Sequence, residues 1–335
     1  MNDMIVQNLL SPAVLFFVLG VIAALFKSDL KFSNGFSEGL SIYLLIAIGM
    51  KGGIELSKYS IEAVFAPIVG ALFLGIVIPF ITLIVMKFIK MDLKNSVGLA
   101  ATYGSISIVT YGAAISFLNN TGTSYEGFMN AIVVLMESPA ILVSLLVLKI
   151  MENKRDVLMV PSQRLGFVPS YSNLIDKSIL KETIFGKSIL LLVGSLLIGV
   201  ILGEQALPKV QPLFIDLYSS VLVLFLLNMG LVAGQRLPEV KKHGVKLIIF
   251  GILAPLVFGS LGVLVGSVVG LSLGGVTLMG VLAGSASYIA APAALKTSVP
   301  DASPSIYLGL SLGVTFPFNL LIGIPVFHEL AKFIS

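Results

Sequence analysis

Serine, threonine and glycine residues gather in two similar stretches, each inside a long apolar run. These are GSISIVTYGAA, residues 104–114, and GSASYIAAPAA, residues 284–294. Glycine weakens a helix, and hydroxyl side chains can bond to nearby backbone groups in competition with the helical hydrogen bonds. Both stretches therefore predict an interrupted helix that exposes backbone groups and hydroxyls to a small ligand.

The expected breaks lie near residues 104–109 and just before Ala290. Pro292 favours a half-helix that begins around Ala290, because proline is tolerated in the first turn of a helix. Half-helix N-termini carry free N–H groups and a partial positive charge, which suit a small anion. Half-helix C-termini carry carbonyl oxygens, which suit a sodium ion. The hydroxyls expected to hold the anion belong to Ser105, Ser107, Thr110, Ser285 and Ser287.

A single acidic residue lies near the middle of an apolar run. It is Glu137, in the segment VLMESPAIL. A carboxylate at membrane depth is costly unless it is paired or hydrated, so we expect a functional role, and a bound sodium ion would offset its charge. The alternative is a neutral, structural carboxyl that bonds to carbonyls freed by Pro139. The positions expected to bind the ion are Glu137, Gly104, Gly284 and Thr315, the last being the counterpart of Glu137 in the second half.

The elements that must position these residues are membrane-spanning helices. The 335-residue chain is 57% hydrophobic and 11% charged, and its mean hydropathy of +1.04 lies outside the range of soluble domains. Long apolar runs favour helices over the short alternating strands of an outer-membrane barrel. We predict an all-α polytopic membrane protein with ten transmembrane helices, at 12–26, 39–56, 61–86, 94–118, 126–149, 184–203, 213–235, 245–270, 274–298 and 305–331.

The composition also excludes several kinds of chemistry. The chain has no cysteine, so it has neither a disulfide nor a thiolate. Its two histidines, His243 and His328, lie near span ends and predict no metal site. The apolar runs contain no catalytic dyad. We expect no enzyme activity, no cofactor apart from sodium as a coupling ion, and no nucleic-acid partner.

The distribution of positive charge predicts how the chain sits in the membrane. When the loops are placed alternately on two sides, all but four of the 21 Lys and Arg residues fall on one side; the exceptions are Lys51, Lys58, Lys209 and Lys332. The positive-inside rule makes the rich side cytoplasmic. We therefore expect a multi-pass protein of the cell's inner (plasma) membrane with both termini outside the cytoplasm.

The two halves of the chain resemble each other. GMKGGIEL, residues 49–56, aligns with GLVAGQRL, residues 230–237, and the two glycine- and serine-rich stretches follow in the same order. We predict a first repeat at 1–149, a cytoplasmic linker at 150–183 and a second repeat at 184–335. Five spans per repeat give the copies inverted topology, which is typical of transporters with a midplane site between two crossing broken helices. Either stretch alone also fits close packing of helices through small residues.

Three segments carry a resemblance to a known family. They are GSISIVT, then TSYEGFMNAIVVLMESPAILV, then AGSASYIAAPAALKTSVPDASPSIYLGLSLGVTFPFNLLIGIPVF. The chain resembles the sodium-dependent bicarbonate transporters first known from cyanobacteria over essentially its whole length, and more broadly the sodium/bile-acid symporters. The resemblance implies an anion between the crossing points and sodium beside it. Where cyanobacterial members have an acidic residue, in SSSDISGPP, this chain has Tyr288, which we add to the substrate-binding positions.

The resemblance also implies partners and leaves alternatives. It implies a homotrimer and a cytoplasmic PII-like regulator, for which the linker at 150–183 is a candidate docking surface. The leading hypothesis is sodium-coupled uptake of bicarbonate or a similar small anion. The alternatives are a transporter like a sodium/proton antiporter, a symporter for another anion, and a transport-inactive membrane sensor or scaffold.

Replacement of the buried acid tests the ion-coupling role. Glu137→Gln removes the charge but keeps the shape of the side chain, so we expect folding to persist and the sodium dependence of transport to disappear. Uptake measured as a function of sodium concentration checks this. Unchanged sodium dependence would contradict the role.

Overall fold

The protein is built from helices throughout the residues that the structure, a computed structural model, describes: 6, 8–159, 185–242 and 244–334. Within these ranges, seven helical segments are long and apolar enough to cross a membrane. The all-α membrane class is therefore confirmed. The count of ten spans and their inverted repetition stay predictions, and most of the predicted linker at 150–183 lies outside the described residues.

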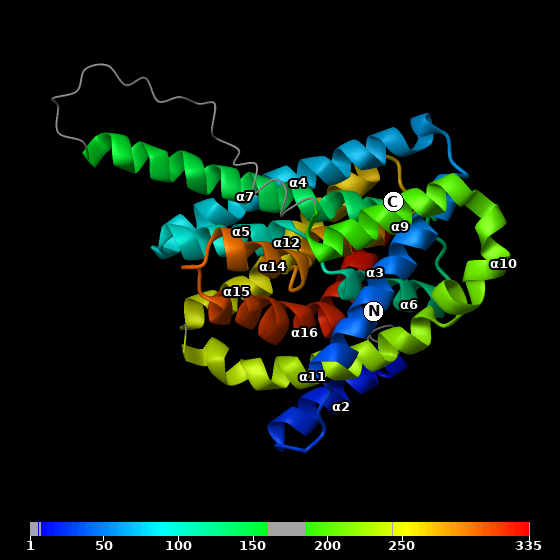
Figure 1. Ribbon diagram of the computed structural model, residues 1–335, viewed down its shortest axis with the longest axis horizontal. Coiled ribbons are helices and arrows are strands. Elements are labelled where there is room, and N and C mark those ends of the chain that lie inside the picture. Colours follow the sequence, from blue (N-terminus) through cyan, green and yellow to red (C-terminus); the bar gives the residue numbers. More distant parts are fainter. Residues whose placement is uncertain (1–5, 7, 160–184, 243, 335) are drawn as a thin grey trace.

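Six helices of the first half have their bounds within the described residues (Figure 1). Four of them follow a serine or aspartate whose side chain accepts a backbone N–H bond from the first turn and so stabilises the helix start: Ser11, Ser33, Asp92 and Ser107. The helices are α2 (Pro12–Leu25), α3 (Asn34–Leu56), α4 (Ile61–Ile89), α5 (Leu93–Gly104), α6 (Ile108–Asn120) and α7 (Met129–Met159).

The second half is also helical, and short irregular turns interrupt its helices. Short helical turns carry the chain from α9 round to α11 at one edge of the molecule (Figure 1). The last helical segment, residues 304–334, was predicted as one span at 305–331; it contains two π-helical turns. The elements are α9 (Lys187–Leu202), η2 (Gly203–Ala206), α10 (Leu207–Val210), η3 (Gln211–Asp216), α11 (Tyr218–Lys242), α12 (Val245–Val268), α13 (Leu273–Gly284), α14 (Ala290–Ser298), α15 (Pro304–Leu310), η4 (Ser311–Thr315), α16 (Phe316–Phe318), η5 (Asn319–Gly323) and α17 (Ile324–Ile334).

Two helices of the first half pack on helices of the second half, and glycines form these contacts. Helix α2 packs along α11, and α3 packs along α9. A Cβ atom on Gly230 would lie 3.0 Å from the Cα atom of Gly20, and one on Gly53 would lie 2.8 Å from the Cα atom of Gly199. Because only glycine lets two backbones approach so closely, these positions set the helix spacing. The aligned glycines of the sequence repeat are therefore contact residues, and each glycine pair faces the other half of the chain.

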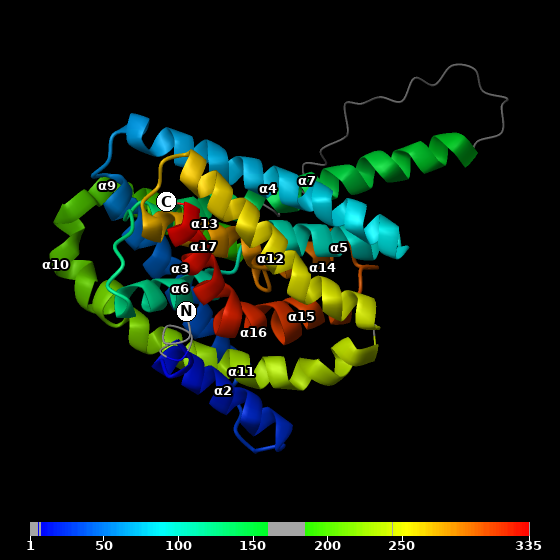
Figure 2. The ribbon, with the colours of Figure 1, turned by 180° about the vertical axis from the view of Figure 1, so that it is seen from behind.

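The two interrupted helices run antiparallel through the centre. Helices α5 and α14 lie toward one end of the molecule, and α6 and α13 lie toward the other (Figures 1 and 2). Their outer ends are held by polar contacts. The Ser272 N–H donates to Glu126 Oε1 at 2.6 Å, where α13 begins. The Ser303 N–H donates to Asn95 Oδ1 at 2.7 Å, where α5 begins. The starts of α5 and α13 are thus each bonded to the other half of the chain.

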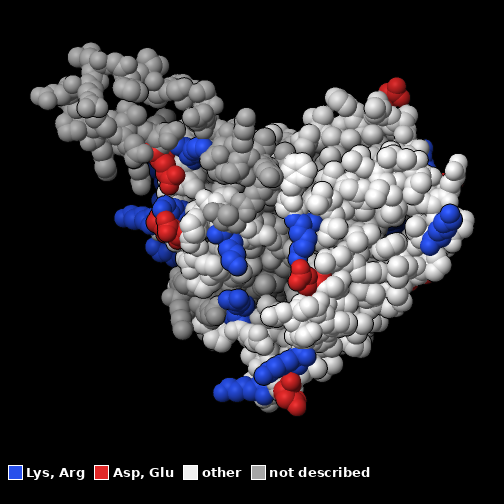
Figure 3. Space-filling model, viewed as in Figure 1, with Lys and Arg blue, Asp and Glu red and all other residues white. Residues whose placement is uncertain are grey.

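The surface agrees with a membrane environment. On the face in Figure 3, most Lys and Arg side chains lie in the left half of the view, and wide areas carry no charge. Large apolar side chains such as Phe65, Phe73 and Phe88 of α4 are exposed, as are Val257 and Leu264 of α12. Exposed apolar surface of this extent fits contact with lipid.

Adding a methyl group to a contact glycine should loosen the exchanged helices. Gly230→Ala places a Cβ atom against the carbonyl oxygen of Phe17 and 3.0 Å from the Cα atom of Gly20, both in the backbone of α2, so we expect a destabilisation of about 1–3 kcal/mol. Thermal unfolding in detergent measures it. Gly194→Ala on α9 is the matched control, because its Cβ atom would meet nothing within 4 Å. Equal stability of the two variants would contradict the packing role.

Candidate ion and substrate site at the crossing of two interrupted helices

The first interruption follows Gly104. Ser105 takes an extended conformation (φ −85°, ψ 172°), which ends α5, and its hydroxyl donates to the carbonyl oxygen of Glu137 at 3.0 Å. Ser107 then starts α6, because its Oγ accepts the N–H of Thr110 at 3.1 Å. The hydroxyls thus replace helical hydrogen bonds, as the sequence predicted, and the break lies at 105–107.

The second interruption has the same form. Ser285 ends α13 with nearly the same dihedral angles as Ser105 (φ −87°, ψ 169°). Helix α14 begins at Ala290, and the Ala291 N–H donates to Ser287 Oγ at 3.2 Å. The predicted start around Ala290 is confirmed, and Pro292 lies in the first turn, where its missing N–H leaves no bond unmade.

The two interruptions are hydrogen-bonded to each other. The Ser107 N–H donates to Ser285 Oγ at 2.9 Å, and the Ser285 hydroxyl donates to the Leu282 carbonyl at 2.8 Å. In the other direction, the Ser287 N–H donates to the Thr102 carbonyl at 2.8 Å. Each interruption therefore provides a hydrogen-bond acceptor for a backbone N–H group of the other, although the two segments lie far apart in the sequence.

The glycines that precede both breaks are packing positions. A Cβ atom on Gly104 would lie 2.7 Å from the side chain of Ala140, and one on Gly284 would lie 2.8 Å from the carbonyl oxygen of Pro255. The Gly284 carbonyl already accepts the side-chain N–H of Asn319 at 2.7 Å. Any part these two glycines have in ion binding stays a prediction.

Four of the predicted residues line one small cavity between the interruptions. They are Ser107, Glu137, Ser287 and Tyr288, and the cavity measures about 10 Å³, the space that one water molecule needs. Glu137 is 1% exposed, and its Oε2 has no hydrogen-bond partner among the described residues. A buried carboxylate oxygen without a partner is expensive, so this atom is the strongest sign of a ligand at the site.

The other predicted residues lie outside this lining. The Thr110 hydroxyl donates to Ser107 Oγ at 2.8 Å, so Thr110 helps to orient the Ser107 side chain, which lines the cavity. Thr315, in the π-helical turn η4, bonds to the Tyr103 hydroxyl at 2.6 Å and donates to the Gly251 carbonyl at 2.7 Å. Ser105 and Ser285 are engaged in the bonds described above.

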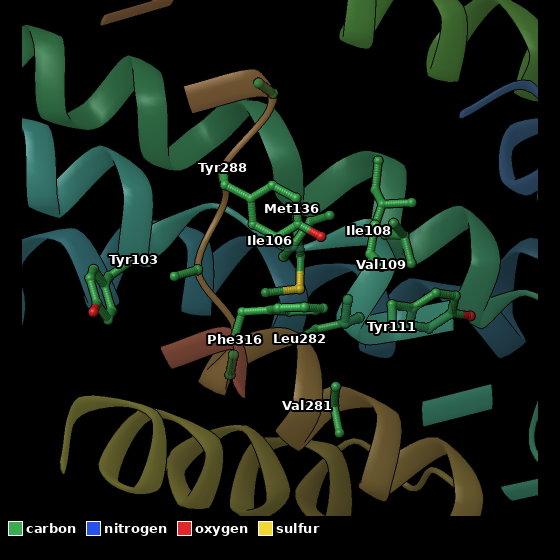
Figure 4. Close-up of a cluster of buried hydrophobic side chains, with 14 of the residues drawn as sticks. Tyr103, Ile106, Ile108, Val109, Tyr111, Met136, Val281, Leu282, Tyr288 and Phe316 are labelled. Carbon is green, nitrogen blue, oxygen red and sulfur yellow. The ribbon is translucent and has the colours of Figure 1, made fainter. Parts of the chain in front are cut away.

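Apolar walls complete the cavity, and reasoning from the sequence missed them. Ile106, Ile108 and Ile289 line it beside the polar residues. Figure 4 shows Ile106 and Met136 beneath the ring of Tyr288, with Phe316 and Leu282 close by. The Tyr288 and Phe316 rings meet edge to face, with their centroids 5.6 Å apart. One usable signal was the isoleucine between Ser105 and Ser107, an apolar residue inside a break.

The site combines one acidic side chain with the N-termini of two helices. Helices α6 and α14 both begin at the interruptions, and each presents a partial positive charge of about half a unit there. No Lys or Arg belongs to the cavity lining. The site therefore offers an acid to a cation and helix N-termini to an anion. Among the described residues, no group of three or more His, Cys, Asp or Glu side chains is placed to hold a metal ion.

Fold and candidate site together describe an all-helical membrane protein in which two interrupted helices cross beside a small buried cavity. The sequence family described as the Na⁺-dependent bicarbonate transporter superfamily matches residues 12–332. The chain therefore belongs to that superfamily, as the resemblance indicated. No curated protein matches the chain directly.

Loss of the bridging hydroxyl should weaken the crossing. Ser285→Ala leaves the buried Ser107 N–H without its acceptor, which costs about 1–3 kcal/mol. We expect a lower unfolding temperature in detergent. Ser144→Ala is the matched control, because the Ser144 hydroxyl is buried without a partner among the described residues. If both variants unfold alike, the bridge contributes nothing to stability.

Proposed function

We propose that the chain is a symporter that couples sodium entry to uptake of bicarbonate or a similar small anion. At the level of the family, it is a Na⁺-dependent bicarbonate transporter. The proposal adds the coupling mechanism and the place where both ions bind, which is the cavity at the crossing of the two interrupted helices.

The observation that carries the proposal is the unpartnered carboxylate oxygen of Glu137, which has no partner among the described residues and lies in a cavity beside two helix N-termini. A carboxylate repels an anion, so Glu137 alone opposes binding of the substrate. A sodium ion on Glu137 removes that repulsion, and the anion in turn favours the sodium ion. Because charges attract strongly at low dielectric, each ion raises the affinity for the other. This mutual effect is what coupled transport requires.

The anion would be held without a basic side chain. Ser107 and Ser287 supply hydroxyls, and the first turns of α6 and α14 supply N–H groups. Hydrogen bonds from backbone amides and hydroxyls suit a small oxyanion. A Lys or Arg would bind the anion with or without sodium, so the absence of a basic residue from this lining favours strict coupling.

A cavity of about 10 Å³ is smaller than the proposed substrate, so the site must enlarge for transport. The proposed movement is alternation between two inverted five-helix repeats around the crossing. The exchange of α2 and α3 between the halves supports two related units, since each half offers the same contact to the other. The proposal places the protein in the inner membrane with both termini outside the cytoplasm. It also includes a homotrimer and a PII-like regulator, which rest on the family resemblance.

Transport by purified protein tests the proposal. The protein is reconstituted into liposomes, and uptake of labelled bicarbonate is measured with and without an inward sodium gradient. We expect accumulation only with sodium, and competition by the anions that the site accepts. Empty liposomes and Glu137→Gln protein are the controls.

Other outcomes separate the alternatives. Sodium-driven uptake of another anion with no bicarbonate uptake keeps the fold argument and replaces the substrate. Sodium-dependent proton movement without anion uptake favours an antiporter. Binding of the anion that stabilises the protein without any flux favours a sensor or scaffold.

A further inference from the structure

A second, larger cavity adjoins the crossing site. It measures about 460 Å³ and lies between the start of α9 and helix α14; its lining includes Lys187, Ser188, Ala290 and Ala293. We call it the vestibule. Among the residues that the structure describes, only Tyr288 and Ile289 line both the vestibule and the small cavity that contains Glu137. The partition between the two spaces is therefore formed by these two neighbouring residues.

Tyr288 is placed to block the passage. Its side chain is 9% exposed, and its hydroxyl makes no hydrogen bond among the described residues, although Ser107 lies near it. Figure 4 shows the ring extending from the connection between α13 and α14 toward Ile106 and Met136. Phe316 supports it edge to face. The ring is held chiefly by apolar contacts, whereas the backbone beside it is fixed by the Ser287 N–H bond to Thr102.

We propose that Tyr288 is the gate between the vestibule and the crossing site, and that its ring must move aside for an ion to reach Glu137. The inference deepens the proposed function, on which its role in transport rests. The vestibule is large enough to admit a small hydrated ion, and the cavity behind Tyr288 has room for one water molecule. The ring therefore separates a space that ions can enter from the space where they would bind.

The gate lies on one short segment between two helices. Residues 285–289 connect α13 and α14. The phenol hydroxyl enters the site with the ring, and it is a donor without an acceptor among the described residues. When the ring is in place, that donor can bond to an anion behind it. The gate thus adds a ligand to the site that it closes.

Accessibility of a single introduced cysteine tests the gate. The chain has no natural cysteine, so Ile106→Cys supplies one thiol, located in the small cavity. Labelling by a small charged methanethiosulfonate is measured by mass on protein in detergent, where reagent reaches both faces. We expect slow labelling with Tyr288 present and labelling faster by about tenfold or more with Tyr288→Ala. Tyr288→Phe keeps the ring, so it should keep the slow rate.

Controls assign the effect to the ring. Ala293→Cys lies in the vestibule, outside the gate, and should react at the same rate whether position 288 keeps its tyrosine or carries the Tyr288→Ala change. Ile289→Ala is the matched neighbour and should leave Ile106→Cys slow. Tyr288→Leu, a milder truncation, replaces Tyr288→Ala if that variant does not give a monodisperse protein. Equal labelling in all backgrounds, or faster labelling only with Ile289→Ala, overturns the proposal.

The labelling experiment is independent of the transported ion. If labelling depends on Tyr288 but sodium-driven anion uptake fails, the gate stands and the proposed function falls. If uptake succeeds while labelling ignores Tyr288, the transporter stands without this gate.

Discussion

The fold depends on how backbone groups are satisfied where two helices stop inside the protein. The Ser107 N–H bonds to Ser285, and the Ser287 N–H bonds to Thr102, so each break supplies what the other lacks. Neither break would be tolerable alone at membrane depth, because lipid offers no hydrogen-bond partner. The surrounding helices bury this junction, and the half-helix starts are fixed at Glu126 and Asn95.

The junction contains one buried acidic side chain, Glu137, whose hydrogen bonding is incomplete. Glu137 has a carboxylate oxygen without a partner among the described residues, and three isoleucines, two serines and a tyrosine form the walls around it. A structural role would have required a bond from that oxygen to neighbouring backbone, which was the alternative raised by Pro139. The described contacts give Oε2 no such bond, which is why the proposed function assigns this atom to a bound ion. The same cavity adjoins two helix N-termini, and a cation and an anion together would neutralise both kinds of uncompensated charge.

Much of this could be predicted because the relevant signals are local. Glycine, serine and Pro292 report on helix continuity within a few residues, and both breaks lie where these residues predicted them. What failed to emerge depends on contacts between distant segments. The Asn319 bond to Gly284 and the vestibule beside α9 are examples. The repeat alignment found Gly53 and Gly230 without indicating their partners, since a glycine's sequence context does not say which backbone it will touch.

The exchanged glycine contacts also bear on how the chain is assembled in a membrane. Helices α2 and α3 are made first, but the surfaces shaped to receive them belong to α11 and α9, which follow more than a hundred residues later. During synthesis the glycine-containing faces of α2 and α3 therefore contact lipid until the second half is inserted. Folding is completed by pairing across the halves, and two separately synthesised halves would carry complementary surfaces through which to recognise each other.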